Sequence, residues 1–303
     1  MIPQDFYKEE IRNDFKVTTK RKKVWATEID LLEKFDECCK DNNLNYFVAG
    51  GTLLGAIRHK GFIPWDDDID VIMTRQDYKK LVKIAPKYFK NQYCFQYYKT
   101  EKKYYKSHAQ LRNSHTTAIL YKDIDKKCSF NQGIFIDVFP LDVIPDKSDK
   151  RKRWINKITK IQKSIYEYDY YNLYKKHSIL GKIRYALIKV IRPNNLMKYL
   201  EHVCSKYSNT NNKQLGDISF LGEKFNSWDR DVFSEQKEYP FECTKVKSVK
   251  DYDYFLRRQY KDYMQPVRDK SNHGVIFFDP DKSYTYYLNE GREELEKYAN
   301  AEH

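Results

Sequence analysis

The segment that most constrains this chain is 46–73, YFVAGGTLLGAIRHKGFIPWDDDIDVIM. An apolar run leads into two glycines and a helical stretch, and a second apolar run carries aspartates. The pattern predicts a buried strand over 46–49, a helix over 53–58, a turn over 61–64 and a second strand over 69–73. Glycines between a strand and a helix let the backbone approach a ligand closely, and the amides at the helix start favour an anion such as phosphate.

Two aspartates, Asp68 and Asp70, are separated by a single residue at the second predicted strand. Alternate residues of a strand share one face, so we expect both carboxylates to project together while Ile69 and Val71 point into the core. Neighbouring carboxylates repel each other, and burying them unpaired costs several kcal/mol. A divalent cation removes this conflict, and all-oxygen ligands suit Mg²⁺ or Mn²⁺, which also take substrate phosphates as ligands.

A third carboxylate is expected from a later predicted strand, 133–138. Asp137 has apolar neighbours on both sides, and acidic residues rarely occupy such positions unless they are paired or bind a metal. Asp142 is a weaker candidate, because Pro140 and Pro145 predict that the strand has already ended. The predicted metal ligands, which are also the predicted catalytic residues, are Asp68, Asp70 and Asp137.

Composition limits the class of protein. A formal charge of +13 indicates a polyanionic partner, which nucleic acid, anionic lipid and phosphate-rich glycan all satisfy. The six cysteines include no C-x-x-C pair, which argues against a zinc site. The chain shows neither a signal peptide nor an apolar run of membrane-spanning length. We therefore expect a cytoplasmic protein with reduced thiols.

The chain divides by composition into three zones, which are 1–146, 147–210 and 211–303. Residues 1–146 mix helix and strand patterns, including an amphipathic helix over 21–40 and a helix over 77–88. Residues 147–210 are helical in pattern and very basic, with 14 Lys or Arg against 3 Asp or Glu between positions 151 and 206. Within this zone, 179–191 is apolar with interspersed cations. Such a segment either lies in a membrane interface or packs on the protein's own core.

The motif GGTLLGAxRxxGFIPWDDDIDV closely resembles the core motif of the LicD family, which comprises phosphocholine transferases of bacterial surface glycans and is related to the fukutin-type ribitol-phosphate transferases. Looser similarities follow at 110–117, at 135–142 and over 252–273, including YKDYM at 260–264, where the family usually has YGDYM. Together these matches span about 45–275. The basic zone 147–210 contains no matching motif, so acceptor choice is assigned to it as a hypothesis.

The resemblance implies an α/β (α+β) fold with a nucleotidyltransferase-like core, in which a small mixed sheet is flanked by helices. Residues 1–146 would then form the catalytic core with its N-terminal helix. The zone 147–210 would be a basic helical insertion that contacts the acceptor or a membrane surface, and 211–303 would pack back on the core. The predicted substrate-binding residues are Gly50, Gly51, Thr52, Arg58, Lys60, Arg112 and Thr116.

The mechanism implied by the resemblance is a Mg²⁺- or Mn²⁺-dependent transfer. A glycan hydroxyl attacks the phosphorus that carries the alcohol in a CDP-alcohol, with CDP-choline as the expected donor, and CMP leaves. Asp137 is the predicted general base and Asp70 the alternative. The acceptor is a glycan or lipid-linked glycan, such as teichoic acid or lipopolysaccharide, and peripheral contact with the anionic inner face of the plasma membrane is expected.

Several neighbouring residues have two interpretations. Asp66 and Asp67 are expected to support or cap the acidic segment, with Asp66 as an additional candidate ligand. Trp65 either packs under this segment or faces a choline headgroup through a cation–π contact. The histidines that are expected to be structural are His108, His115 and His273.

Two other functions remain open from the sequence. A nucleotidyltransferase would use the same aspartates but would direct the attack to the α-phosphorus and release pyrophosphate. A basic nucleic-acid-binding protein is the second alternative, but the sequence has no recognised RNA-binding module. Three aspartates would also repel a polyanion unless a metal were bound, so no nucleic-acid partner is expected.

Overall fold

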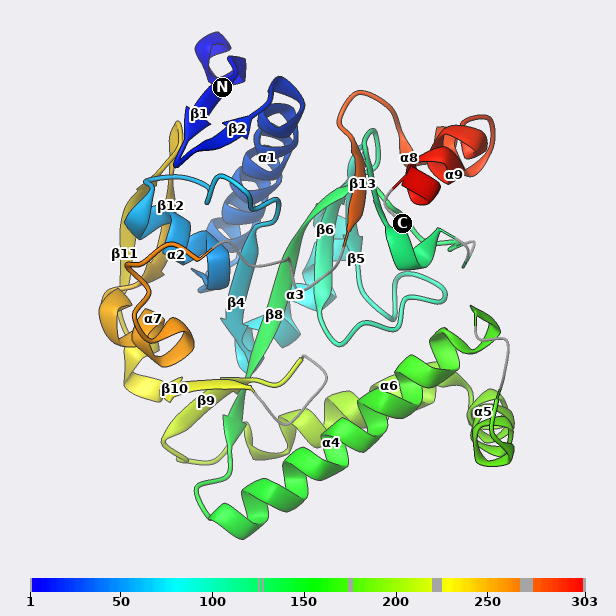
Figure 1. Cartoon of the computed structure of the whole chain (residues 1–303). Helices are drawn as coiled ribbons and strands as arrows, with labels where there is room; N and C mark the ends of the chain where they lie inside the picture. Colours follow the sequence, from blue (N-terminus) through cyan, green and yellow to red (C-terminus); the bar gives the residue numbers. More distant parts are fainter. Residues whose placement is uncertain are drawn as a thin grey trace.

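The computed structural model describes residues 2–124, 126, 128–173, 177–219, 225–267 and 275–301. Its centre is a mixed sheet built around the long strand β8, with helices packed against it (Figure 1). This arrangement confirms the predicted α+β class. The strands of the central sheet are β3 (Phe47–Val48), β4 (Asp70–Thr74), β5 (Tyr93–Gln96), β6 (Ala109–Asn113), β8 (Ile134–Ile144), β9 (Gln214–Asp217) and β10 (Asn226–Asp229).

Smaller elements surround this sheet. Three separate strand pairs are antiparallel: β1 (Glu10–Arg12) with β2 (Phe15–Val17), β11 (Gln236–Phe241) with β12 (Thr244–Val249), and β13 (Ile276–Asp279) with β7 (Thr117–Leu120). The α-helices are α1 (Thr19–Asp41), α2 (Gly50–Arg58), α3 (Arg75–Tyr88), α4 (Ser148–Asp169), α5 (Ile179–Ile191), α6 (Pro193–Cys204), α7 (Tyr252–Tyr260), α8 (Tyr284–Leu288) and α9 (Arg292–Ala301). Short 3₁₀ helices cover Gln4–Tyr7, Tyr121–Asp123, Tyr171–Leu173, Ser205–Tyr207 and Arg230–Phe233.

Strand β8 organises the sheet because it has three partners. It runs parallel to β4, pairs antiparallel with β6 through its first half and pairs antiparallel with β9 through its last residues. Beyond β4, β3 pairs antiparallel. The parallel β4–β8 pair is connected through α3, β5, β6 and β7, so residues about 65 positions apart in sequence lie side by side.

Helices α1 and α3 pack against β8 and against each other. Side chains alternate between the two faces of the sheet, which explains how the helices pack. Val71, Ile136 and Val138 are fully buried in this core, while the intervening residues point to the other face. Thr18 caps α1 by accepting a hydrogen bond from the Arg21 amide at 3.2 Å. The expected helices over 21–40 and 77–88 correspond to α1 and α3.

The predicted end of the third strand is wrong. Strand β8 continues through Pro140 to Ile144 and therefore includes Asp142. The pairing explains why a proline is tolerated there: β6 pairs up to Val138 and β9 begins at Leu141, so Pro140 lies between the two partner strands on that edge. A residue without an N–H can occupy such a gap without breaking a ladder bond.

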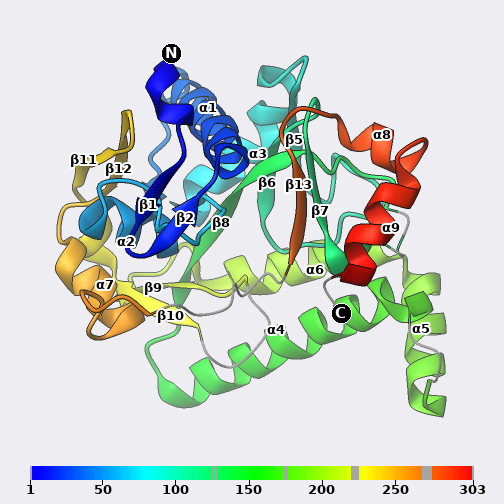
Figure 2. The same cartoon turned by 45° about the horizontal axis from the view of Figure 1, so that its top comes forward.

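Helices α4, α5 and α6 lie together along one end of the sheet (Figures 1 and 2). Trp154 of α4 ties this layer together by donating its indole N–H to the Val203 carbonyl at 2.7 Å. The chain then returns to the central sheet as β9 and β10, and β13 pairs with β7 near the other end. No helix in the described ranges combines the length and hydropathy needed to cross a membrane.

Candidate active site

Asp70 and Asp137 are paired in register on the adjacent parallel strands β4 and β8. The Asp137 amide also donates to the Ile69 carbonyl at 2.9 Å, which locks this register. Residues that pair in a sheet project to the same face, so the two carboxylates lie on the face opposite the buried Ile136 and Val138. The structure therefore brings together two of the three predicted carboxylates, from segments far apart in sequence.

The glycine pair begins α2 and faces these carboxylates. Gly50 has φ +58°, and a Cβ at this position would lie 2.9 Å from Asp70 Oδ2. A Cβ at Gly51 would collide with the carboxylate of Asp66. Gly50 thus requires glycine because of its left-handed conformation and its close neighbour, whereas a side chain at Gly51 would displace the Asp66 carboxylate.

Thr52 serves a different purpose from the predicted substrate contact. Its side chain is buried, and Oγ1 accepts the Asp70 amide N–H at 2.9 Å. The Ala49 amide in turn donates to the Asp70 carbonyl at 3.0 Å. Helix α2 and strand β4 are therefore joined at Asp70 itself, which positions this carboxylate beside the Gly50 backbone.

Helix α1 holds the acidic segment that precedes β4. The Asp66 carbonyl accepts hydrogen bonds from the Trp25 indole at 3.0 Å and from the Arg21 guanidinium at 2.9 Å. Trp25 stacks on Phe62, with ring centroids 4.7 Å apart. The conformation of this segment is thus imposed by the N-terminal helix, a contact that the local sequence pattern does not predict.

Trp65 packs through its ring edges. Its neighbours are Phe15, at a centroid distance of 6.3 Å, and His59, at 6.5 Å. These contacts agree with the interpretation that Trp65 packs beside the acidic segment.

Asp137 is supported by a buried polar network on β6. Gln110 donates to Asp137 Oδ1 at 2.6 Å, and His108 Nε2 lies 3.0 Å from the same oxygen. This second contact does not meet hydrogen-bond geometry, and burial lowers the pKa of His108 although the Asp137 charge opposes this. Burial opposes ionisation of Asp137, but the charges and hydrogen bonds of its neighbours outweigh burial and lower its pKa.

Arg112 completes this network and corrects a prediction. Its side chain is 2% exposed, and its guanidinium donates to Gln96 Oε1 at 2.7 Å, to the Gly133 carbonyl at 2.7 Å and to Gln110 Oε1 at 2.6 Å. The predicted nucleotide contact is incompatible with this burial. Arg112 instead orients Gln110, because it occupies the amide oxygen and leaves the amide nitrogen to face Asp137.

Thr116 is also interior rather than substrate-facing. Its hydroxyl donates to the Asn113 carbonyl at 2.8 Å and accepts the Ile134 amide at 2.9 Å. The side chain closes the turn between β6 and β7 against the start of β8. His115 beside it is exposed, and the predicted structural His273 lies outside the described residues.

Lys106 is a cation that the sequence analysis did not single out. Burial lowers its pKa to about 8, against the opposing effect of Asp137. Its ammonium lies over the rings of Tyr104 and Phe135, at 5.9 Å and 5.6 Å from their centroids. It makes no hydrogen bond or ion pair with the part of the chain that the structure describes. A desolvated cation beside the carboxylates is suited to a phosphate oxygen.

The C-terminal part of the chain contributes Tyr260. Its hydroxyl lies 3.8 Å from the position of a Cβ on Gly50, and its pKa is raised by burial and by the charges of Asp70, Asp66 and Asp68. The resemblance of YKDYM at 260–264 to the family motif indicated that this segment is relevant to the site. It did not indicate which of its residues reaches the site.

Arg58 anchors this C-terminal segment. Its guanidinium donates to the Tyr263 carbonyl at 2.9 Å, and burial lowers its pKa. The phosphate role of Arg58 therefore stays a prediction, and its observed partners in this structure are backbone carbonyls and the His59 ring. Lys60 is exposed with φ +55°, and its carbonyl accepts the Glu242 amide at 2.7 Å.

Asp68 does not lie on a strand as predicted, because β4 begins at Asp70. Among the described residues, no three Asp, Glu, His or Cys side chains are grouped closely enough to hold a metal ion. The structure thus supplies the Asp70–Asp137 pair, while Asp68 as the completing ligand stays a prediction.

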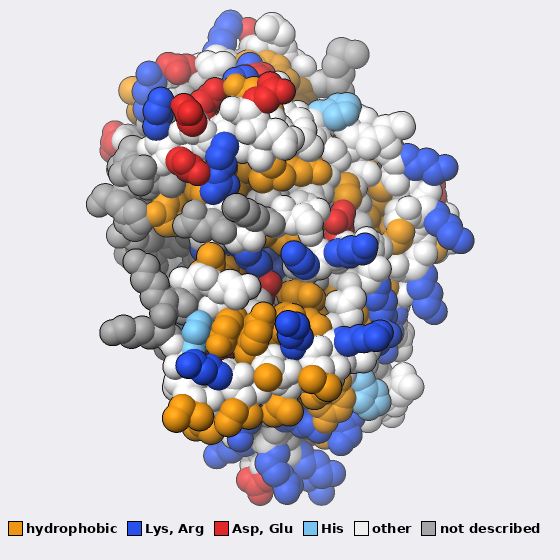
Figure 3. All heavy atoms as spheres, turned by 90° about the vertical axis from the view of Figure 1, so that its right-hand side faces the viewer, with side chains coloured by type: hydrophobic (Ala, Val, Ile, Leu, Met, Phe, Trp, Pro, Cys, Tyr) orange, Lys and Arg blue, Asp and Glu red, His pale blue; other side chains and the backbone are white. Residues whose placement is uncertain are grey.

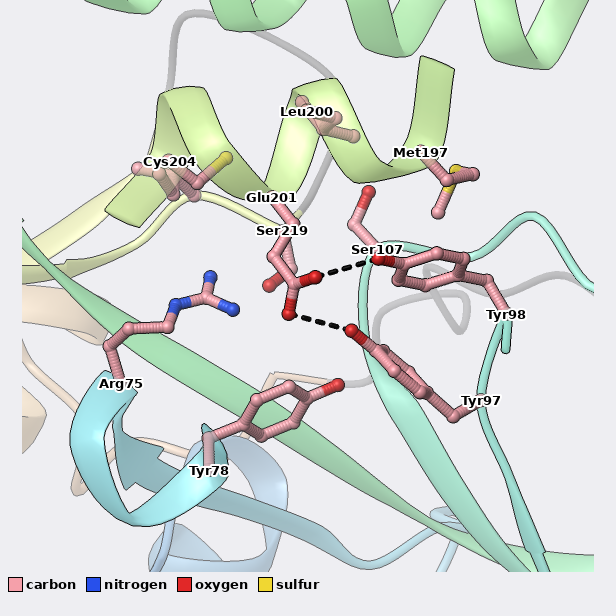
Figure 4. A pocket seen from close by; sticks show the side chains of 11 residues that line it. Arg75, Tyr78, Tyr97, Tyr98, Ser107, Met197, Leu200, Glu201, Cys204 and Ser219 are labelled. Atoms are coloured by element: carbon pink, nitrogen blue, oxygen red, sulfur yellow. Dashed lines mark hydrogen bonds between the residues drawn. The ribbon is translucent and has the colours of Figure 1, made fainter. Parts of the chain in front are cut away.

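The cavity in Figure 4 is distinct from this site. It lies between α3 and α6 and has a volume of about 20 Å³, little more than one water molecule occupies. Tyr97 and Tyr98 donate to the two Glu201 oxygens at its edge, both at 2.6 Å. Asp142 lies beyond this cavity in a buried ion pair with Arg75, with an Nε–Oδ1 distance of 2.7 Å. Asp142 is therefore structural.

Glu28 gives the first prediction. This α1 side chain is buried, its Oε2 has no hydrogen-bond partner among the described residues, and burial and the charges of Asp67, Asp68 and Asp66 raise its pKa well above 4.5. Below pH 4.5 the native and unfolded chains both hold the proton. Above it only the unfolded chain ionises, so the native state loses about 1.4 kcal/mol per pH unit until the folded pKa is reached.

Glu28→Gln should remove this pH-dependent loss. We expect urea midpoints, measured with EDTA present, to fall less between acidic and neutral pH for the variant than for the wild type. Glu33→Gln, an exposed position on the same helix, serves as the control. Its urea midpoint should fall with pH as steeply as that of the wild type. If the urea midpoints of Glu28→Gln and the wild type fell equally with pH, Glu28 would ionise normally in the folded protein.

Comparison with known proteins shows which family the sequence resembles. Residues 43–172 match the family described as "LicD/FKTN/FKRP, nucleotidyltransferase domain". The chain is 27% identical over 281 residues to the lipopolysaccharide cholinephosphotransferase LicD of Haemophilus influenzae, covering 82% of this chain and 93% of that protein. An uncharacterized Rickettsia prowazekii protein is 39% identical over 67 residues, covering 22% of this chain and 25% of that protein.

The family match contains Gly50, Asp70, Gln110 and Asp137, the residues that the sheet brings together. The longer similarity to the Haemophilus protein extends over most of the chain, beyond this segment. Both similarities support a phosphotransferase of the LicD type.

Proposed function

We propose that this protein transfers phosphocholine from CDP-choline to a hydroxyl of a cell-surface glycan precursor, such as a lipopolysaccharide or teichoic acid precursor, and releases CMP. The similarity to a lipopolysaccharide cholinephosphotransferase supports the phosphocholine group. The observation that carries the proposal is the in-register Asp70–Asp137 pair against the Gly50 backbone. Two carboxylates on one sheet face beside a glycine at the start of a helix suit a diphosphate held through a cation.

The residues present fit Mg²⁺ or Mn²⁺. Asp70 and Asp137 offer oxygen ligands on one face, and the observed contacts of Gln110 and His108 both engage Asp137 Oδ1. Asp70 and Asp137 would hold the cation, and we propose Asp68 as a third ligand. When bound, the cation neutralises the donor's diphosphate and makes CMP a better leaving group.

The chain's own residues orient the reaction. Gln110 fixes Asp137, Thr52 fixes Asp70, and Lys106 offers a cation to a phosphate oxygen. The acceptor hydroxyl forms a bond to the phosphorus of phosphocholine as the bond from that phosphorus to the bridging diphosphate oxygen breaks. The hydroxyl proton passes to a carboxylate, with Asp137 as our candidate base and Asp70 as the alternative.

A panel of CDP-alcohols tests the substrate class. Purified protein with Mg²⁺ and a glycan acceptor should release CMP from CDP-choline faster than from CDP-ethanolamine or CDP-ribitol. Release of pyrophosphate from CTP, with a nucleotide attached to the acceptor, would instead make the protein a nucleotidyltransferase. A preference for CDP-ribitol would retain the reaction type and overturn the phosphocholine assignment.

Gln110 provides a prediction for the positioning network. Gln110→Leu should raise the Mg²⁺ concentration needed for half-maximal CMP release by about 10–100-fold, because loss of an outer-shell hydrogen bond loosens a ligand by that factor. Gln162→Leu is the matched control: this buried glutamine donates to the Ile218 carbonyl at 2.8 Å in the α4 region. It should lose stability without changing the Mg²⁺ dependence. An unchanged Mg²⁺ requirement in Gln110→Leu would contradict the assigned role of Asp137.

The reaction is proposed to occur at the cytoplasmic face of the plasma membrane. CDP-alcohols are soluble donors, whereas a lipid-linked glycan acceptor stays in the bilayer. A peripheral association with anionic lipid would bring the two substrates together.

A further inference from the structure

Helix α5 exposes an apolar face that its own fold leaves uncovered. Six large apolar side chains on this helix are between 51% and 81% exposed. They are Ile179, Leu180, Ile183, Leu187, Val190 and Ile191. At about 100° per residue these positions cover a stripe roughly 120° wide, the width of an amphipathic helix's apolar face.

The inner face of α5 determines which way this stripe points. Tyr185 stacks on Tyr168 and Tyr171, with centroid distances of 5.1 Å and 3.9 Å, and Ile188 is buried. Ser178 caps the helix by accepting the Gly181 amide at 3.1 Å. The helix is therefore held against α4 and α6 by one side, and its apolar side is directed away from the protein.

Cations border the apolar stripe on both sides. On the same helical projection, Arg184 follows one edge of the stripe and Lys182 and Lys189 lie beyond the other. Lys182 and Lys189 are exposed and have no ion-pair partner among the residues that the structure describes. Figure 3 shows apolar side chains gathered near the lower end of this side of the molecule, with Lys and Arg side chains around them.

We propose that α5 is an in-plane membrane anchor that inserts its apolar stripe into the interface of an anionic lipid bilayer. An apolar face bordered by cations matches an acyl region covered by anionic headgroups. Charge complementarity favours this occupant over a second copy of the chain, because two such surfaces would bring like charges together. The basic character extends along α4, where Lys152, Lys157 and Lys160 are exposed.

This anchor deepens the proposed function and rests on it for its biological purpose: a lipid-linked acceptor would be presented at the surface on which α5 lies. The binding itself depends only on the helix. Lipid binding and CMP release can therefore be measured separately, and the failure of one does not imply the failure of the other.

Vesicle sedimentation tests the anchor. Wild-type protein should bind vesicles of phosphatidylglycerol and phosphatidylcholine, bind phosphatidylcholine vesicles much more weakly, and lose affinity as salt rises. Leu187→Glu combined with Val190→Glu should weaken binding by about tenfold or more, because two charges would enter the apolar interface. Ile11→Glu, an equally exposed apolar position on β1 that is 77% exposed, should bind like the wild type.

A second double variant controls for misfolding. Lys182→Glu combined with Lys189→Glu leaves the apolar face intact and should still reduce binding to anionic vesicles, with an unchanged melting temperature. With a soluble glycan acceptor and no vesicles, both double variants should release CMP from CDP-choline at the wild-type rate. Unchanged vesicle binding in both double variants would overturn the proposal. So would a wild-type dimer in analytical ultracentrifugation that dissociates in Leu187→Glu/Val190→Glu without any vesicle binding.

Discussion

Asp70→Asn should reduce CMP release by about 10³-fold or more while leaving the fold intact. A cation that stabilises transition-state charge contributes several kcal/mol, and each 1.4 kcal/mol corresponds to a factor of ten in rate. Asparagine keeps the shape of aspartate and the backbone bond to Thr52, but it removes the charge that holds the cation beside Gly50. The measurement is the rate of CMP release at saturating CDP-choline and Mg²⁺, with the melting temperature as the check on folding.

Asp77→Asn is the matched control for this variant. Asp77 belongs to the same strand–helix unit, at the start of α3, and pairs with Lys80 at 3.1 Å on the protein surface. Its loss should change the rate less than twofold, because surface pairs contribute little and Asp77 lies beyond the far end of β4. Wild-type activity in Asp70→Asn would refute the proposed site, whichever phospho-alcohol is transferred.

Arg75→Met should destabilise the protein by about 3–5 kcal/mol, because it leaves the Asp142 carboxylate buried without its partner. The pair is fully interior, with Arg75 Nε 2.7 Å from Asp142 Oδ1 and Nη2 2.5 Å from Oδ2. The free energy of unfolding from urea titration gives the size of the effect. The folded fraction should retain normal CMP release, since Arg75 and Asp142 lie at the opposite end of β4 and β8 from Asp70 and Asp137.

The double variant Arg75→Met/Asp142→Leu separates pairing from packing. Replacing both charges by apolar groups removes the uncompensated carboxylate, so most of the lost stability should return. If the double variant were no more stable than Arg75→Met, packing rather than charge would explain the loss. A specific loss of activity in the folded single variant would reinstate Asp142 as a functional carboxylate.

Much of the site was predictable from the sequence because its central motif is local. The order strand, glycine pair, helix, turn and strand is encoded within 46–73, and β3, α2 and β4 follow it closely. Asp137 was predictable because an acidic residue inside an apolar run requires a partner. The aspartate at position 68 was placed incorrectly on the strand, since strand ends depend on pairing: β8 pairs with β4 only from Asp70 onward.

The residues that support the site were not predictable from local patterns. Arg112 and Thr116 were predicted as ligand contacts because they lie in the family-like segment 110–117, yet both are interior. Gln110 and Lys106 acquire their roles only because β6 lies beside β8. Tyr260 reaches Gly50 from the distant C-terminal part of the chain.

The sequence by itself therefore determined the family motif, the α+β class, the glycine requirement and the acidic character of the site, because these depend on residue type and short-range periodicity. Only the tertiary structure decided that Asp70 and Asp137 lie in register, that Asp142 is an ion-pair partner and that α5 turns its apolar stripe outward. These outcomes depend on which strands pair and which helix faces are covered. Such choices are settled by packing over the whole chain, where residues far apart in sequence compete for the same buried surface.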